Sequence, residues 1–199
     1  MGQGEGDALN RAADVAVAGV GLALTSPLLG LAALAIKLED GGPILYRQTR
    51  VGKDGVDFEV LKLRTMVVGA EGIGAGYAVD RGDRRITRIG RVLRRTSIDE
   101  LPQLWNILRG DMSVIGPRPT LRYQVEQYDE HQRRRLDIRP GLTGWAQVHG
   151  RASLPWAERI ELDVWYVRNR SPRMDLEILL RTPLALFRGT YRGATGGWR

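Results

Sequence analysis

An uncharged apolar segment constrains this chain more than any other feature of its sequence. The 22 residues 15–36 contain no Asp, Glu, Lys or Arg, and about 20 apolar residues suffice for a helix to cross a hydrocarbon core. A secretory signal peptide would begin with basic residues, whereas residues 1–14 hold three acidic side chains and one Arg. A buried helix of a soluble protein is the remaining alternative. We expect a membrane helix followed by a soluble remainder.

Ser26 and Pro27 divide this segment into two halves. A proline inside a helix removes one backbone hydrogen bond and bends the chain, and the hydroxyls of Thr25 and Ser26 can satisfy the freed carbonyls in lipid. Each half is about half as long as a bilayer core. We therefore expect a re-entrant helix, with residues 1–38 as the membrane unit and residues 39–199 as a cytoplasmic domain. The alternative is a kinked single span with the N-terminus outside. The basic residues that assign the cytoplasmic side are Lys37, Arg47, Arg50 and Lys53.

Charge and composition narrow the classes of partner. Residues 37–199 carry 29 basic and 20 acidic side chains, a balance that suits nucleic acid, phosphorylated metabolites or a membrane surface. The chain has no Cys and two His, which excludes disulfides, a thiol nucleophile and sites built on Cys or several His. A nucleic-acid-binding protein would explain the charge, but the apolar segment and an aromatic content of 7% argue against it.

The rest of the sequence predicts short helices around one hairpin. Residues 44–52 and 56–66 are typical of two strands joined by a turn at 53–55. Residues 68–83 are rich in Gly and predict a loop. Helices are expected over 84–95, 101–110, 121–136, 154–168 and 174–187, the last interrupted near Pro183. The predicted fold class is mostly α with a small β-hairpin element (α+β), with amphipathic helices at the membrane interface.

Asp99 and Glu100 are the strongest candidates for chemistry. Ser97 and Glu100 have the spacing of a capping box at the start of a helix, where backbone amides and the helix dipole stabilise ionised carboxylates. An ionised Asp can attack phosphorus while its neighbour holds a divalent ion. Capping alone would also explain Glu100. Because only oxygen ligands are at hand, the sequence favours Mg²⁺, with Mn²⁺ as the alternative, held by Glu100 and Asp99.

Basic residues around this pair predict an anion site. Arg88 and Arg95 lie in the arginine-rich stretch before it, and Arg118 lies in a loop fixed by Pro117 and Pro119. Lys62 and Arg64 alternate along one predicted strand, so that both side chains are expected in the same site. No phosphate-binding motif of the nucleotide triphosphatases or kinases occurs.

Five blocks of sequence resemble the bacterial sugar transferase family, the monotopic polyprenol-phosphate phosphoglycosyl transferases. The blocks are GPILYRQTRVGKDG, FEVLKLRTM, RITRIGRVLRRTSIDELPQLWNILRGDMSVIGPRP, RPGLTGWAQVHGR and ELDVWYVRNRS. They occur in family order, and the resemblance covers about residues 12–187. The resemblance implies transfer of a phospho-sugar from a UDP-sugar to a polyprenol phosphate in the bilayer, with release of UMP. This is a first membrane step of glycoconjugate assembly, at the cytoplasmic face of the bacterial inner membrane. A membrane-anchored scaffold without catalysis is the alternative, and a homodimer is left open.

The resemblance also implies roles for single residues. Asp99 matches a nucleophile that forms a covalent intermediate, and Glu100 matches its Mg²⁺-associated partner. Further matches are the Pro117-Arg118-Pro119 loop, the basic strand with Lys62 and Arg64, the substrate-binding positions Arg95, Asp163 and Asp175, and the helix break at Ser26-Pro27. No nucleic acid is expected among the partners.

Overall fold

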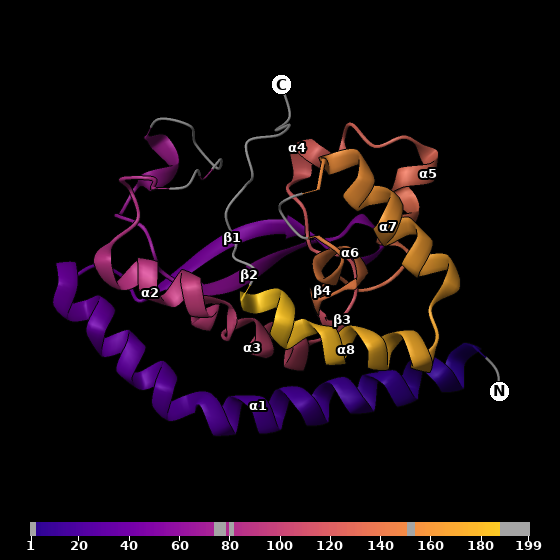
Figure 1. The fold of residues 1–199 in the computed structure, drawn as a ribbon, viewed down its shortest axis with the longest axis horizontal. Coiled ribbons are helices and arrows are strands. Elements are labelled where there is room, and N and C mark those ends of the chain that lie inside the picture. Colours follow the sequence, from indigo (N-terminus) through magenta and orange to yellow (C-terminus); the bar gives the residue numbers. More distant parts are fainter. Residues whose placement is uncertain (1–2, 74–78, 80–81, 151–153, 188–199) are drawn as a thin grey trace.

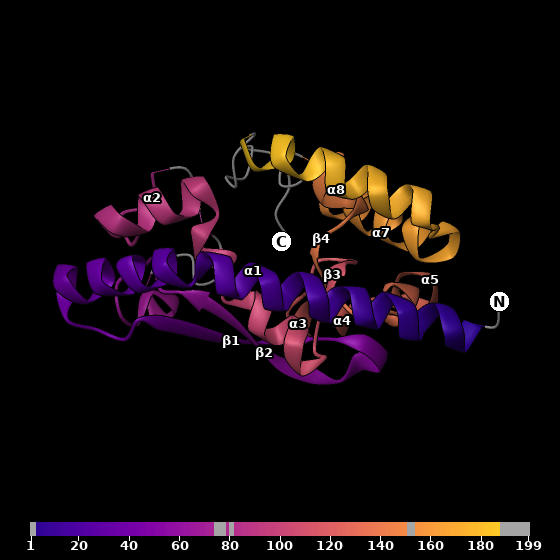
Figure 2. The ribbon, with the colours of Figure 1, turned by 90° about the horizontal axis from the view of Figure 1, so that it is seen from below.

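A long N-terminal helix and an antiparallel hairpin form the frame of the molecule. The computed structural model describes residues 3–73, 79, 82–150 and 154–187. Helix α1 (Gln3–Asp40) runs the length of the molecule, with the hairpin along one side and helices α2 (Arg88–Thr96) and α8 (Pro172–Phe187) along the other (Figure 2). The mostly helical class with a small β element is thus confirmed.

Helix α1 is continuous but bends near its middle (Figure 1). Pro27 lacks the amide that would bond to the carbonyl of Ala23, and the hydroxyl of Ser26 donates to that same oxygen at 2.9 Å. The hydroxyl of Thr25 donates to the carbonyl of Gly21 at 2.7 Å. The predicted break is therefore a bend whose free carbonyl has a side-chain donor, as expected.

One narrow stripe of α1 packs against the domain while the rest is exposed. Ala18 is fully buried among Leu104, Ile107 and neighbouring side chains, and Ile36 packs in a second cluster with Leu63. The remaining surface of α1 is apolar and uncovered, so that only 11% of its apolar window is buried. By length and composition it is the one helix among the described residues that could cross a membrane. The leucines and valines exposed along it are Leu9, Val15, Val17, Val20, Leu24, Leu28, Leu31, Leu34 and Leu38.

The predicted hairpin is confirmed. Strand β1 (Leu45–Val51) pairs antiparallel with β2 (Asp57–Leu63), in a register that joins Leu45 to Leu63 and Val51 to Asp57. The 3-10 turn η1 (Lys53–Gly55) connects them, with Asp54 and Gly55 at positive φ. Helix α2 lies close against the end of β2, because a Cβ at Gly90 would stand 2.0 Å from the Thr65 carbonyl oxygen.

The remaining elements are mostly short, and they include a second, two-stranded sheet. They are η2 (Ala70–Gly72), η3 (Ile98–Glu100), α3 (Gln103–Arg109), β3 (Ser113–Ile115), α4 (Arg122–Val125), α5 (Glu130–Arg133), η4 (Arg134–Leu136), β4 (Gly141–Thr143), α6 (Trp145–Val148) and α7 (Trp156–Asn169). β3 and β4 are parallel. Gly110, at φ 97°, ends α3 at the predicted residue.

Several predicted helices differ from those observed. The stretch 121–136 forms α4, α5 and η4 rather than one helix, because Asp129 caps a new helix start with its side chain. Helix α8 runs through Pro183, since a single lost backbone bond does not end a packed helix. Helix α2 begins at Arg88, after an N-cap formed by Thr87, and not at residue 84. Within the predicted loop 68–83, residues 74–78, 80 and 81 lie outside the described residues, and 70–72 form the 3-10 turn η2.

Candidate active site

Asp99 and Glu100 lie in the 3-10 turn η3, between α2 and α3. The predicted capping box is wrong: Ser97 adopts the left-handed conformation at φ 57° and makes no side-chain cap, and α3 begins only at Gln103. The sharp turn at Ser97 ends α2 and directs the chain inward. Both carboxylates are buried as a result, with Asp99 8% and Glu100 7% exposed.

Glu100 is held by two cations that come from distant parts of the chain. Its Oε1 accepts hydrogen bonds from Lys62 Nζ at 2.8 Å and from Arg118 Nη2 at 2.5 Å. Lys62 lies on β2, and Arg118 lies in the loop that follows β3. Burial alone would raise the pKa of Glu100, but the charges and hydrogen bonds of Arg118 and Lys62 outweigh burial and hold that pKa well below its usual range. Glu100 is therefore an anion at neutral pH.

Asp99 lies beside this arrangement without a hydrogen-bond donor among the described residues. Burial and the neighbouring Glu100 raise the pKa of Asp99 to about 6, although Lys62, Arg94 and Arg118 oppose the shift. A carboxylate without donors keeps its lone pairs available. It is also poorly stabilised as an anion, and both properties increase its reactivity toward an electrophile.

Arg94 is a cation near this site that the sequence prediction did not single out. It lies one turn before Ser97 on α2, lowers the pKa of Asp99 by its charge, and contacts the Thr65 hydroxyl at 3.4 Å. The sequence offered a weak signal, because six arginines crowd residues 84–95 and only the helix face distinguishes them. Arg88 and Arg95, which were predicted, have exposed side chains on the same helix.

Arg64 does not join the anion site, contrary to the prediction from strand alternation. Strand β2 ends at Leu63, and the buried guanidinium of Arg64 turns toward the end of α1. Its Nη1 bonds to Asp40 Oδ2 at 2.6 Å and its Nε bonds to the carbonyl of Pro43 at 2.5 Å. Arg64 thus joins the C-terminal end of α1 to the end of the hairpin.

Asp163 and Asp175 also have partners away from the dyad. Asp163, on α7, is 3% exposed and pairs with Arg135 Nη2 at 2.5 Å. Asp175, on α8, accepts a hydrogen bond from the Tyr166 hydroxyl at 2.6 Å, and burial raises the pKa of its carboxyl group. Both carboxylates join secondary-structure elements, so that direct contact with a phosphate, as predicted, is not what this geometry provides.

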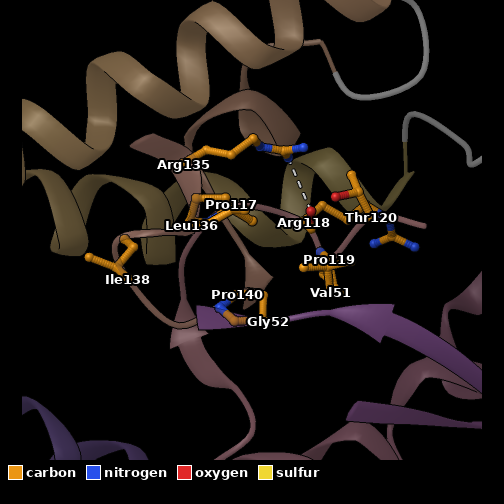
Figure 3. A pocket seen from close by; sticks show the side chains of 10 residues that line it. All are labelled: Val51, Gly52, Pro117, Arg118, Pro119, Thr120, Arg135, Leu136, Ile138 and Pro140. Carbon is orange, nitrogen blue, oxygen red and sulfur yellow. Dashed lines mark hydrogen bonds between the residues drawn. The ribbon is translucent and has the colours of Figure 1, made fainter. Parts of the chain in front are cut away.

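The loop that carries Arg118 is fixed from behind. The Arg118 carbonyl accepts a hydrogen bond from Arg135 Nη2 at 3.0 Å, drawn as a dashed line in Figure 3. A small pocket is lined by this loop together with residues of the hairpin and of η4 (Figure 3). Its lining comprises Val51, Gly52, Pro117, Arg118, Pro119, Thr120, Arg135, Leu136, Ile138 and Pro140.

The described residues offer two carboxylates for a divalent ion. No group of three or more His, Asp or Glu that could hold a metal occurs in the part of the chain that the structure describes. The oxygens of Asp99 and Glu100 are nevertheless the ligand type that Mg²⁺ prefers, and Mg²⁺ is commonly held by one or two carboxylates together with substrate phosphates and water. The donor set therefore fits an ion that arrives with a phosphorylated substrate.

Comparisons with known proteins agree with this constellation. The bacterial sugar transferase family matches residues 6–189. The chain belongs to this family. A UDP-glucose:undecaprenyl-phosphate glucose-1-phosphate transferase of Caulobacter vibrioides is 50% identical over 184 residues, which cover 88% of this chain and 68% of that protein. The predicted enzyme class, a polyprenol-phosphate sugar-phosphate transferase, is thereby confirmed.

Other family members differ in size and in the substrate that their names state. A UDP-N-acetylgalactosamine-undecaprenyl-phosphate N-acetylgalactosaminephosphotransferase of Aeromonas hydrophila is 43% identical, and the match covers 91% of this chain but 44% of that protein. The exopolysaccharide production protein ExoY of Rhizobium meliloti is 40% identical over 94% of this chain and 89% of its own length. The family relation thus leaves the sugar open.

Proposed function

We propose that this member of the family transfers a sugar phosphate from a UDP-sugar to a polyprenol phosphate, with Asp99 as the nucleophile. The observation that carries the proposal is the pairing of two unlike carboxylates. Glu100 is fixed by Lys62 and Arg118, whereas Asp99, its neighbour, is buried without a donor among the described residues. The names of the relatives supply the donor and acceptor classes.

The reaction proceeds in two displacements. An Asp99 oxygen attacks the β-phosphorus of the UDP-sugar, and the bond from that phosphorus to the bridging oxygen breaks, so that UMP leaves with the electron pair. A phosphate oxygen of the polyprenol phosphate then attacks the phosphorus of the acyl phosphate. This second step forms a polyprenol-diphosphate sugar and returns Asp99 to its carboxylate form.

The cations of the site offset the charge of the reacting groups. Lys62, Arg94 and Arg118 surround the dyad, and an Arg fork suits the paired oxygens of a phosphate. In this proposal Arg118 and Lys62 also orient Glu100, so that its carboxylate is in place before the donor binds. Mg²⁺ held by Glu100 and Asp99 would neutralise part of the donor diphosphate's charge.

We also propose that α1 is re-entrant and that the enzyme lies on the cytoplasmic face of the inner membrane. Near its N-terminus, Arg11 donates to the carbonyls of Ile107 and Leu108 at 2.6 and 2.8 Å, and Asp14 accepts from the Val114 amide at 2.8 Å. At its other end, Asp40 pairs with Arg64. Both ends are thus fastened to one domain, which supports placing them on the same side of the bilayer.

A donor panel tests the proposed reaction. Purified enzyme with Mg²⁺ and polyprenol phosphate is incubated with UDP-glucose, UDP-galactose and UDP-N-acetylhexosamines, and UMP is measured. Release of UMP from one donor, dependent on the acceptor for turnover, is expected. Intact mass spectrometry without acceptor should show a phospho-hexose adduct on the wild-type chain and none on Asp99→Asn. Turnover by the Asn variant would overturn the role of Asp99.

A further inference from the structure

The loop that carries Arg118 is anchored through its backbone carbonyls. Pro117 and Pro119 have no backbone N–H, so that the loop depends on its carbonyls for anchoring. All four consecutive carbonyls from residue 117 to residue 120 accept a hydrogen bond. The donors, in order, are the Gly141 amide at 2.9 Å, Arg135 Nη2 at 3.0 Å, Arg50 Nη1 at 3.3 Å and the Val51 amide at 2.9 Å.

Arg135 makes the contact nearest to the reacting groups. It bonds to the carbonyl of Arg118, whose guanidinium holds Glu100 Oε1. Its Nη1 also donates to the Tyr128 hydroxyl at 2.5 Å, and that hydroxyl reaches the Thr120 side chain at 3.4 Å. A single guanidinium therefore touches the loop directly at Arg118 and indirectly at Thr120.

The orientation of Arg135 is in turn imposed by its surroundings. The side chain is 4% exposed, pairs with the equally buried Asp163, and lies over the rings of Tyr128 and Trp156 at 5.8 and 5.7 Å. A buried charge needs a partner of opposite sign, and Asp163 is that partner. The N–H groups of a planar guanidinium point in fixed directions. Once Asp163 and Tyr128 have bound to Arg135, the direction of its remaining hydrogen bond to the loop is therefore set.

We propose that Arg135, oriented by Asp163, is a positioning residue that aims the guanidinium of Arg118 at Glu100. This inference rests on the proposed function only for its effect on turnover. It assigns Asp163 a place behind the loop rather than on the substrate. Small displacements of a catalytic group cost rate steeply, about 100-fold for 1 Å.

Arg135→Lys is the main test variant, because lysine keeps the charge beside Asp163 but cannot bond to Asp163, Tyr128 and the Arg118 carbonyl with one fork. Arg122→Gln is the matched control: it removes an exposed arginine just after the loop, and the partners of that arginine are Asp57 and the carbonyl of Gly55 rather than the loop. We expect kcat/KM to fall at least about tenfold in Arg135→Lys and to stay unchanged in the control.

A double-mutant cycle separates positioning from general destabilisation. If Arg135 acts through Arg118, then adding Arg135→Lys to Arg118→Lys should change kcat/KM by less than about twofold. Effects that multiply would overturn the proposal. Asp163→Asn, with the same cycle, replaces Arg135→Lys if that variant does not fold.

Amide hydrogen exchange gives a readout that needs no substrate. The amides of Val51 and Gly141 bond to loop carbonyls, so that both should exchange faster in Arg135→Lys than in wild type or Arg122→Gln. Unchanged exchange at both amides would overturn the proposal even if activity falls. Absence of UMP release by the wild type would instead refute the proposed function, and exchange alone would then decide this inference.

Discussion

Lys62 Nζ lies 2.8 Å from Glu100 Oε1, although 38 residues separate the two in sequence. The contact joins the hairpin to the turn between α2 and α3 and places a cation beside both carboxylates of the dyad. Burial lowers the pKa of Lys62, while the charge of Glu100 opposes that shift. Through Lys62, strand β2 contributes a side chain to the site.

Replacing Lys62 with Gln should therefore impair catalysis. The variant loses the hydrogen bond from Lys62 Nζ to Glu100 Oε1, keeps the one from Arg118, and removes a charge that helps to keep Glu100 ionised. We expect kcat to fall about 100-fold, the scale of losing one preorganised donor. Lys53→Gln, an exposed lysine in the turn of the same hairpin, should keep wild-type UMP release. Equal activity of both variants would contradict the role of Lys62.

Asp99→Asn should abolish transfer and stabilise the fold. Because burial and Glu100 raise the pKa of Asp99 from 3.8 to about 6, the native state binds this proton more tightly than the unfolded chain. The contribution of Asp99 to the free energy of unfolding therefore falls as pH rises from about 4 to about 6. The melting temperature of Asp99→Asn should exceed that of the wild type by a margin that grows over this pH range. Thermal scans in chelator check this, and a margin that shrinks with rising pH would contradict it.

Asp40 should show the opposite dependence on pH. The hydrogen bonds from Arg64, with that from the Gly42 amide, lower the pKa of Asp40 from 3.8 to about 2. Its contribution is fully present above the unfolded value and is lost as pH falls through about 4 toward 2. Asp40→Asn should therefore melt below the wild type at neutral pH, with the difference vanishing near pH 2. Glu126→Gln, at an exposed position, serves as the control for a lost surface carboxylate.

The features that depend on a few neighbouring residues could be predicted from the sequence. The apolar segment, the bend at Pro27 and the hairpin all follow from runs, breakers and alternation over a few residues. The Asp-Glu pair was found by residue type, and its neighbours Lys62 and Arg118 by charge. All of these features are present in the structure.

The features that could not be predicted depend on contacts between residues that are distant in the sequence. Strand alternation placed Arg64 beside Lys62, but Asp40 at the end of α1 competes for its guanidinium. Asp163 has its partner 28 residues away, in a run of three arginines where nothing local marks Arg135 as the buried one. Ser97 matched a cap by spacing, yet its left-handed backbone ends one helix instead of starting another. Tertiary packing overrode the local signal in each case.

The position of the N-terminus decides between a re-entrant and a spanning α1. A straight helix over residues 15–36 would be about 33 Å long, enough to cross about 30 Å of hydrocarbon, so that length alone does not discriminate. The anchors do: Arg11 and Asp14 bind the domain near the start of α1, and Asp40 binds it at the end. Because a straight span would separate these anchors by a whole bilayer, we expect Gly4 on the cytoplasmic side.

Cysteine labelling measures this directly, since the chain has no cysteine of its own. Gly4→Cys should react with an impermeant maleimide only after lysis, as should Lys53→Cys in the exposed hairpin turn. Replacing Ser26 and Pro27 with Leu removes the bend and the hydroxyl that donates a hydrogen bond to the Ala23 carbonyl. In that background Gly4→Cys should become reactive in intact cells, because a straight apolar helix is free to span, while Lys53→Cys stays protected. Ready labelling of Gly4→Cys without those changes would establish a span and refute re-entry.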